Sequence, residues 1–473
     1  MSSRNESIEA VRKRIGWIYR DLKWLTDEDA AEKECEKERL LESLSSRAHY
    51  RCNGNKIYLG KLSPGCIKCV QGKWSCMFIN SLCPAKCFFC AQDRESRTEH
   101  APIACGLIFD DRDDYLDYLE TFGFKGVSFS GGEPLLVFDL LLSYISGIKQ
   151  RFGSNFYVWM YTNGILVDGD KLKRLRKSGL DEIRFNICPV NYDLEKVELA
   201  KRFIETVTVE IPTVPEDYDI LKKSIVEMQR IGVSYLNLHQ LDTTVYNYKN
   251  YINRYYTFLH QMYVPILESE LTALKIMSYA ADNNISIPIN YCSAAYAFRV
   301  QGKGERLLLA SFVREGDYEE ITCDGYIRRI TVVDSARNIY KVIKVLRENN
   351  CEKRLWSLDG TRTELTVHHS LLRFIDFHEH HMVVMYFTAE LGDKADQDCK
   401  EIELNSRKKV FVSRKLLGLF NQPGNYVISR LFKLHLQCVP GTEGGAEIRK
   451  RDSDLLQKMR RYEQMETGFS EYF

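Results

Sequence analysis

Short apolar runs alternate with amphipathic segments between residues 74 and 241, and this alternation limits the possible folds more than any other feature. Two amphipathic segments end at Gly179 and Gly232, as helices closed by glycine do. A repeated strand–helix order predicts a parallel sheet with right-handed crossovers. Six such units fit an incomplete TIM-like barrel better than a dinucleotide-binding fold, since no GxGxxG follows any run. The predicted strands are 74–79, 126–130, 156–162, 182–187, 206–212 and 235–241, with helical patterns such as 139–152, 169–179 and 218–232 between them.

The 473 residues are enough for two or three domains. Residues 1–48 carry two helical patterns, and residues 49–80 are rich in Cys, Gly and Lys. We predict the barrel over 74–310, where a last apolar run at 285–292 ends the alternation. We predict a separate α+β region over 311–473, which shapes substrate access or docks a partner.

Two local signals predict individual elements. Thr26 and Asp29 have the spacing of a helix cap, and the helix that they begin runs to about Leu44. Asp359 and Gly360 lie between two runs of strand-forming residues and predict a β-hairpin.

The composition favours a cytosolic protein. A net charge of +1 provides no field that gathers nucleic acid or a membrane surface, so we expect neither as a partner. The N-terminus is charged throughout, and no run approaches the roughly 18 apolar residues of a membrane span. In a reducing compartment the 15 cysteines are better explained by metal ligation than by disulfides, because seven of them fall between Cys52 and Cys90.

Three cysteines directly follow the first predicted strand. Cys83, Cys87 and Cys90 lie on one loop, at the end of a strand where barrel enzymes place their active sites. Thiolates at these gaps can reach three corners of an iron–sulfur cube, which leaves the fourth iron to a ligand that is not protein. The alternative is a zinc loop with a remote fourth ligand.

The pattern CxxxCxxC, with an aromatic before its third cysteine, resembles the radical S-adenosylmethionine (SAM) superfamily. A second signature, Gly131-Gly132-Glu133-Pro134, stands at the end of the second strand, where that family has it. Within this superfamily the resemblance is to uncharacterised relatives of pyruvate formate-lyase activating enzyme. It implies a partial (β/α)6 barrel and a 4Fe–4S cluster on Cys83, Cys87 and Cys90. It also implies that SAM chelates the unique iron while the Gly-Gly-Glu strand receives its amine, since glycines permit close approach and a carboxylate neutralises an ammonium.

The resemblance assigns further SAM contacts by position. Phe89 matches the aromatic whose backbone meets the adenine, and Asn163 belongs to a Thr-Asn-Gly motif after the third strand. Asn186 and His239 end the fourth and sixth strands, where polar side chains touch SAM or substrate. Glu210, in the fifth strand, departs from the basic or hydroxyl residue that the family often has there.

A second set of cysteines lies upstream. Cys52, Cys66, Cys69 and Cys76 include a CxxC within a Gly/Pro-containing loop and make a complete four-thiolate set. They predict a structural or electron-transferring site that holds zinc or a second iron–sulfur cluster. Cys76 lies on the first predicted strand and is alternatively a core residue.

Two weaker signals concern a possible substrate contact and a possible metal site. Cys292, Gln301 and Arg306 follow the last barrel strand, where they could cap the barrel and touch substrate. Five histidines at 368, 369, 378, 380 and 381 could bind a metal, but without a companion motif a polar strand end is the favoured interpretation.

The resulting functional prediction is a radical SAM enzyme. A reduced cluster would cleave SAM to a 5′-deoxyadenosyl radical, which abstracts hydrogen from a small molecule or a peptide or protein side chain. A flavodoxin- or ferredoxin-type donor would supply the electron. The alternatives are a non-catalytic metal-stabilised scaffold, a glycyl-radical activating enzyme and an RNA-modifying enzyme.

Overall fold

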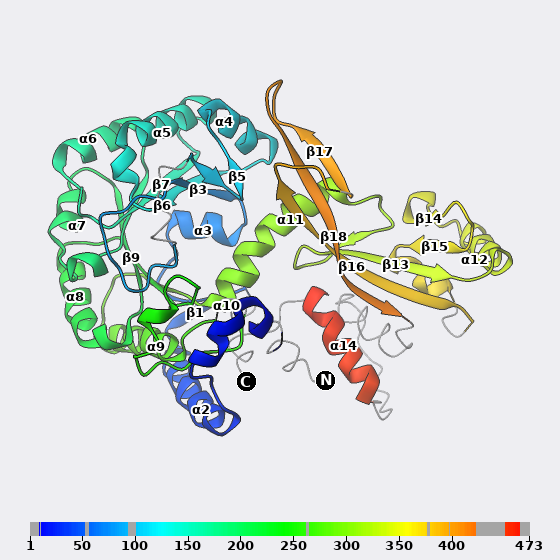
Figure 1. Cartoon of the computed structure of the whole chain (residues 1–473), viewed down its shortest axis with the longest axis horizontal. Helices are drawn as coiled ribbons and strands as arrows, with labels where there is room; N and C mark the ends of the chain where they lie inside the picture. Colours follow the sequence, from blue (N-terminus) through cyan, green and yellow to red (C-terminus); the bar gives the residue numbers. More distant parts are fainter. Residues whose placement is uncertain are drawn as a thin grey trace. The chain divides into compact units, whose positions relative to one another are not determined.

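The computed structural model describes residues 9, 11–52, 56–92, 101–261, 264–375, 379–396, 398–421 and 450–463. These residues belong to two compact units (Figure 1). One comprises Glu6–Gly302 with Leu404–Lys408, and the other comprises Lys303–Glu403 with Lys409–Glu466.

The first unit is built on a parallel sheet, which confirms the α/β fold predicted from the alternating pattern. All neighbouring strands from β3 to β11 in this part of the sheet are parallel. The run at 285–292 contributes β11, so the sheet continues one strand beyond the six predicted units. In spatial order the strands are β3 (Trp74–Asn80), β6 (Gly126–Gly131), β7 (Tyr157–Thr162), β8 (Glu182–Phe185), β9 (Thr206–Pro212), β10 (Tyr235–His239) and β11 (Ile289–Cys292).

Helices cover the outer face of this curved sheet (Figure 1). Gly179 ends α6 in the left-handed conformation at φ 99°, as the sequence predicts. The outer helices are α4 (Arg112–Thr121), α5 (Phe138–Phe152), α6 (Gly169–Ser178), α7 (Glu195–Ala200), α8 (Tyr218–Arg230) and α9 (Leu267–Asp282). Short helices join them: η2 (Pro134–Val137), η3 (Cys188–Val190), η4 (Pro215–Asp217), η5 (Tyr248–Asn250), α10 (Ala294–Tyr296) and η6 (Ala297–Gln301).

Antiparallel strands extend the sheet at both edges. β2 (Lys56–Leu59) pairs with β11 and with β1 (Ala48–Arg51), while β4 (Ile103–Ala104) joins β3 to β5 (Leu107–Ile108).

A short helix, α3 (Pro64–Val70), occupies the middle of the ring of strands (Figure 1). Ser63 caps it by accepting a hydrogen bond from the Cys66 N–H at 3.1 Å, and Pro64 stands in its first turn. A Cβ on Gly65 would lie 2.3 Å from Nη2 of Arg184 on β8, so only glycine lets α3 approach the sheet this closely.

The N-terminal segment forms η1 (Gly16–Asp21) and α2 (Asp27–Leu44). Thr26 accepts a hydrogen bond from the Asp29 N–H at 3.2 Å, which confirms the predicted cap. α2 packs on α9, where the buried side chains of Lys37 and Glu270 pair at 3.4 Å.

The second unit is an antiparallel sheet with helices. The β14–β15 pair confirms the hairpin predicted at Asp359–Gly360. Its sheet runs in the order β14 (Trp356–Leu358), β15 (Glu364–Val367), β13 (Ile327–Val333), β16 (His381–Gly392), β18 (Lys409–Asn421) and β17 (Cys399–Glu403), with β12 (Glu320–Ile321) paired to β13. The helices are α11 (Gly302–Val313), α12 (Ala336–Glu348), η7 (Lys353–Leu355), η8 (His369–Phe374) and α14 (Lys450–Glu463).

A search of the described residues finds no helix long and apolar enough to span a membrane.

Candidate active site

The loop that carries Cys83, Cys87 and Cys90 leaves the carboxyl end of β3, and the three side chains are partly exposed. Side-chain amides from the turn after β7 and from η5 hold this loop. Asn163 Nδ2 donates to Cys83 Sγ at 3.4 Å, and Asn250 Nδ2 donates to the Phe88 carbonyl at 2.7 Å. Contacts with the barrel mouth therefore help to fix the loop, together with its internal hydrogen bond from the Cys90 N–H to the Cys87 carbonyl at 3.2 Å.

Gly131 and Gly132 bring the end of β6 against the chain that enters this loop. A Cβ on Gly132 would lie 1.9 Å from the carbonyl oxygen of Leu82, and one on Gly131 would lie 2.2 Å from that of Asn80. Two backbone hydrogen bonds join the same segments, from the Gly132 N–H to Asn80 at 2.8 Å and from the Glu133 N–H to Leu82 at 2.7 Å. In the chain itself these glycines make room for neighbouring backbone, whereas the sequence suggested room for a ligand.

Glu133 is fully buried and connects β6 to the Thr-Asn-Gly turn after β7. Its carboxylate accepts hydrogen bonds from Thr162 Oγ1 at 2.9 and 3.1 Å and from the N–H groups of Asn163 at 2.8 Å and Leu135 at 3.2 Å. Burial raises the pKa of Glu133, and these donors oppose the rise. Since Asn163 donates to Cys83, Glu133 positions the cysteine loop through Asn163.

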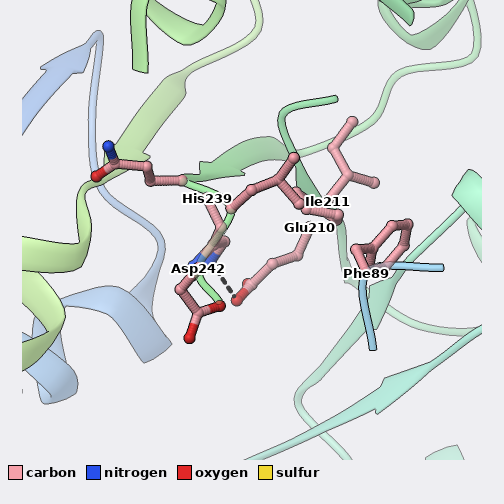
Figure 2. A pocket seen from close by; sticks show the side chains of 8 residues that line it. Phe89, Glu210, Ile211, His239 and Asp242 are labelled. Atoms are coloured by element: carbon pink, nitrogen blue, oxygen red, sulfur yellow. Dashed lines mark hydrogen bonds and ion pairs between the residues drawn. The ribbon is translucent and has the colours of Figure 1, made fainter. Parts of the chain in front are cut away.

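A cavity of about 250 Å³ opens beside the cysteine loop (Figure 2). His239, at the end of β10, lines it, and its Nε2 lies 2.8 Å from Glu210 Oε1. Burial raises the pKa of Asp242, which also lines the cavity, to about 6. The lining residues are Phe89, Glu210, Ile211, Pro212, His239, Gln240, Leu241 and Asp242.

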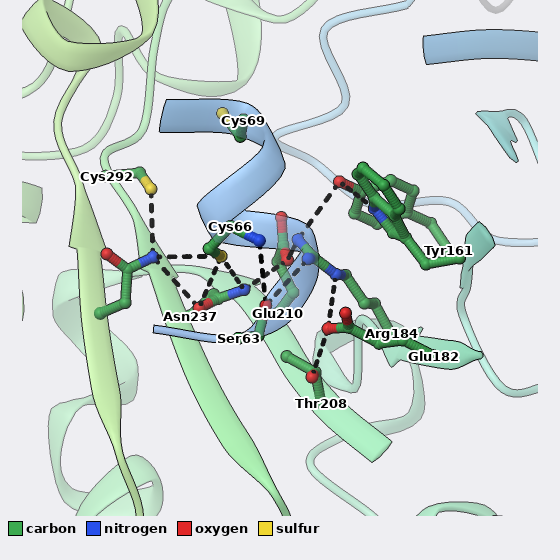
Figure 3. A network of polar contacts seen from close by, with 12 residues as sticks. Ser63, Cys66, Cys69, Tyr161, Glu182, Arg184, Thr208, Glu210, Asn237 and Cys292 are labelled. Carbon is green, nitrogen blue, oxygen red and sulfur yellow. Dashed lines mark hydrogen bonds and ion pairs between the residues drawn. The ribbon is translucent and has the colours of Figure 1, made fainter. Parts of the chain in front are cut away.

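Glu210 joins this cavity to a polar network on the inner face of the sheet (Figure 3). Its Oε2 accepts hydrogen bonds from Arg184 Nη1 at 2.7 Å and Asn237 Nδ2 at 2.8 Å. Burial alone would raise the pKa of Glu210, but Arg184 and His239 outweigh it and hold the pKa well below its usual value. Arg184 also donates to Glu182 Oε1 at 2.9 Å. Glu210, which departs from the family pattern, is therefore paired with Arg184, a partner that the sequence did not indicate.

The second set of cysteines is distributed differently from the prediction. Cys66 and Cys69 are buried on α3, and burial raises the pKa of both thiols. Cys292 lies with them, because Asn290 Nδ2 is 3.3 Å from Cys292 Sγ and 3.8 Å from Cys66 Sγ (Figure 3). Cys76 is on β3 and Cys52 follows β1. Within the described residues no three of these thiols lie within 4.8 Å of one another, so the structure does not preform a zinc site from the predicted four.

Residues 77–196, which contain the three-cysteine loop and the Gly-Gly-Glu segment, match the family model of the Radical SAM superfamily. These residues carry a Radical SAM superfamily domain. A Methanocaldococcus jannaschii protein provisionally named a glycyl-radical enzyme activating enzyme is 27% identical over 303 residues, which cover 62% of this chain and 79% of that protein. The chain is thus a radical SAM enzyme, with the TIM-like sheet of that superfamily.

Solved structures of radical SAM proteins show weaker likeness. Streptococcus suis SuiB bound to S-adenosylmethionine is 14% identical with a TM-score of 0.32, over 46% of this chain and 49% of SuiB. The native protein anSMEcpe with bound AdoMet is 15% identical with a TM-score of 0.29, over 37% of this chain and 54% of that protein. Methylornithine synthase is 11% identical with a TM-score of 0.33, over 61% of this chain and 86% of the synthase. The chain spans about half the length of the first two, and scores this low support no argument about substrate.

The cysteine loop fits the cofactors of the superfamily, a 4Fe–4S cluster and SAM. It offers three soft sulfur donors on one segment, and one of them accepts an amide N–H as cluster thiolates do. When bound, these cofactors supply the reductive cleavage of SAM to a 5′-deoxyadenosyl radical. Cys83, Cys87 and Cys90 would hold the cluster, and the chain's own amides would orient it.

The residues predicted to contact SAM lie near the carboxyl ends of the strands. Their interactions with SAM stay predictions. Phe89 and His239 share the cavity, while Asn163 lies against Cys83. Asn186 follows β8, where its Oδ1 accepts a hydrogen bond from the Cys188 N–H at 3.1 Å, and it is not among the residues that line the cavity.

Proposed function

We propose that this radical SAM enzyme abstracts hydrogen from a peptide or protein substrate that docks beside the cysteine loop. The observation that carries the proposal is a set of exposed apolar side chains on the segment that follows β10. Tyr255 is 99% exposed and Tyr246 is 54% exposed, and Val245 and Ile252 are exposed with them. Aromatic residues are enriched in protein interfaces, and contiguous patches of exposed apolar side chains mark interaction sites.

This segment, residues 244–255, is attached to the cysteine loop. Asn247 Nδ2 donates to the Phe89 carbonyl at 3.1 Å, and the Arg254 guanidinium lies 3.8 Å from the centre of the Phe88 ring. A peptide bound on the exposed tyrosines would therefore lie next to the residues that hold the cluster. The salt bridges of Glu210 with Arg184 and His239 would fix the opposite wall of the cavity.

The first experiment tests SAM cleavage. The chain is reconstituted anaerobically with iron and sulfide, SAM and dithionite are added, and 5′-deoxyadenosine is quantified by mass spectrometry. We expect wild type and Cys35→Ala to form it, because Cys35 is an exposed residue of α2, and Cys87→Ala to form none. Equal yields from Cys87→Ala would contradict cluster binding by this loop.

The second experiment tests the substrate class. An extract of the source organism is separated by size, and each fraction is added to the cleavage assay in wild type, Tyr246→Ser and Tyr255→Ser. We expect the macromolecular fraction to stimulate SAM cleavage by the wild-type enzyme, and protease treatment of that fraction to abolish the stimulation. The fraction should stimulate SAM cleavage by Tyr246→Ser and Tyr255→Ser less than it stimulates wild type. Tyr340→Ser is the matched control, since Tyr340 is 64% exposed on α12 of the other unit. Stimulation by the protease-treated small-molecule fraction would reject the peptide proposal.

A second candidate is activation of a glycyl-radical enzyme, which the similarity to the M. jannaschii protein favours. It predicts that the stimulating macromolecule acquires a stable backbone radical, seen as an EPR signal that remains after the activase is removed. Electron supply by a flavodoxin or ferredoxin belongs to the same proposal and is tested by replacing dithionite with either protein.

A further proposal concerns the second set of cysteines, which we infer to bind zinc or a second cluster on Cys66 and Cys69 with Cys292 beside them. The CxxC of α3 and the shared contact of Asn290 with Cys66 and Cys292 support it. We expect Cys69→Ala to lose metal that Cys83→Ala retains, measured as iron and zinc per chain.

A further inference from the structure

Within the described residues, one group of side chains that could ligate a metal lies in the second unit. Glu320 on β12, together with His368 and His369 at the start of η8, places three donor atoms within 4.8 Å of one another. From the sequence, without a companion motif, a polar strand end is the favoured interpretation of these histidines. Their partner in the structure is a carboxylate on β12, 49 residues before His369. His378 lies outside the described residues, and His380 pairs with Asp334 instead.

Both imidazoles converge on the same oxygen of Glu320. His368 Nε2 lies 3.2 Å from Oε1, and His369 Nδ1 contacts that oxygen as well. A tetrahedral zinc with bonds of about 2.0–2.1 Å keeps its ligand atoms about 3.3 Å apart, so the His368–Glu320 spacing is compatible with two ligands of one ion. The His369 Nδ1 contact with Glu320 Oε1 is that of a hydrogen bond, which metal binding would open.

The rest of the group is arranged to leave that oxygen for the two histidines. Glu320 Oε2 accepts hydrogen bonds from Arg328 Nη2 at 2.7 Å and from the His369 N–H at 3.2 Å. Ser370 holds the His368 ring with Nε2 toward the carboxylate. Its N–H donates to His368 Nδ1 at 3.2 Å, and its Oγ, 2.8 Å from the same nitrogen, is placed to accept the Nδ1 proton that metal binding at Nε2 requires. The three side chains are also accessible to an incoming ion, being 17–22% exposed.

We infer that Glu320, His368 and His369 bind a divalent transition-metal ion, with Zn²⁺ as the ion that suits two imidazoles and a carboxylate. Three protein ligands leave a coordination position open for water or another ligand. The ion would tie β12 to η8. Without it the same atoms can form two imidazole–carboxylate hydrogen bonds, and the experiment separates these two states.

The test uses the full chain with its cluster reconstituted, so that the cysteine loop is occupied. The protein is treated with chelator, given Zn²⁺, freed of excess metal, and its zinc and iron per chain are measured. We expect His368→Gln and His369→Gln to hold one zinc fewer than wild type, with unchanged iron. His380→Gln is the control, because His380 pairs with Asp334 at 2.8 Å in the same unit and should keep the wild-type zinc content.

Ser370→Ala adds a readout that loss of folding does not mimic. It keeps all three ligands and should weaken zinc affinity about 10–100-fold, as removal of a hydrogen bond behind a ligand does. Zinc should also raise the unfolding midpoint of wild type and of His380→Gln by more than that of His368→Gln, which keeps only the zinc that the cysteines of α3 hold. Equal zinc content in wild type, His368→Gln and His369→Gln would overturn the inference and leave the group as a hydrogen-bonded pair of histidines.

Discussion

In the barrel mouth, single residues of the Gly-Gly-Glu segment contact other segments of the protein itself. Gly132 is required because Leu82 occupies the space of a side chain, and Glu133 accepts hydrogen bonds from the Thr162 hydroxyl and the Asn163 N–H of the turn after β7. Both belong to a motif that identifies the superfamily. Their contacts show that part of that motif's role here is to hold the cysteine loop in place.

The carboxylate of Asp242 gives a pH-dependent prediction. Burial raises its pKa from 3.8 to about 6, so between about pH 4 and 6 the folded chain holds a proton that the unfolded chain has released. Stability therefore falls as the pH rises through this window, and the full penalty is present above it. We expect Asp242→Asn to increase the free energy of unfolding by roughly 1–2 kcal/mol at about pH 7.5, the shift being discounted for partial exposure.

The measurement is urea unfolding of Asp242→Asn and wild type at about pH 7.5 and about pH 4. The difference between the two proteins should vanish at the lower pH, where Asp242 is protonated in the folded state. A difference of the same size at both pH values would show that the effect comes from packing and not from titration.

At the scale of elements, α3 contacts the sheet, and α2 contacts an outer helix, through buried charged side chains. α3 lies across the inner face with Gly65 against Arg184 and Glu182. α2 lies on α9 through the buried pair of Lys37 and Glu270. Both contacts combine charge with burial, so small changes there should have large effects.

Gly65→Ala should destabilise the barrel unit by about 1–3 kcal/mol, because the new methyl group would overlap the guanidinium of Arg184. Gly360→Ala is the matched control, since a Cβ at Gly360 meets nothing within 4 Å. Denaturant unfolding measures both. An equal loss in the two variants would indicate backbone flexibility rather than steric overlap.

Lys37→Met should destabilise the chain by about 3–5 kcal/mol, because it leaves Glu270 buried without its cation. Burial lowers the pKa of Lys37 and raises that of Glu270, which shows how poorly each charge is solvated there. The double variant Lys37→Met/Glu270→Leu should recover most of the loss, and Lys275→Met, which breaks the more exposed pair with Glu36, should cost about 1 kcal/mol or less. Failure of the double variant to recover would assign the loss to packing.

At the scale of the whole molecule, cofactor binding should be visible as a change in stability. A ligand that binds only the folded state stabilises it. Anaerobic loading with iron and sulfide should therefore raise the midpoint of the calorimetric transition that Gly65→Ala lowers, because both act on the barrel unit. Cys87→Ala should abolish the rise, while Cys35→Ala keeps it. A rise of equal size in Cys87→Ala would mean that the iron binds elsewhere.

The sequence by itself determined the strand–helix order and the placement of its two principal motifs. Strand and helix periods are local properties, so the runs at 126–130 and 156–162 predict β6 and β7 without knowledge of their partners. The loop after each strand end then follows from the parallel sheet, and Cys83, Cys87 and Cys90 necessarily lie at its carboxyl edge.

The tertiary structure decided which distant side chains meet. Cys292 joins Cys66 and Cys69 because β11 and α3 face each other inside the barrel, and no spacing in the sequence reports that. The acidic residue at position 210 is explained by its hydrogen bond with Arg184, which lies 26 positions away on the neighbouring strand. Glu320 meets His368 and His369 only after folding. Local periodicity depends on neighbours along the chain, whereas a site depends on contacts that packing alone creates.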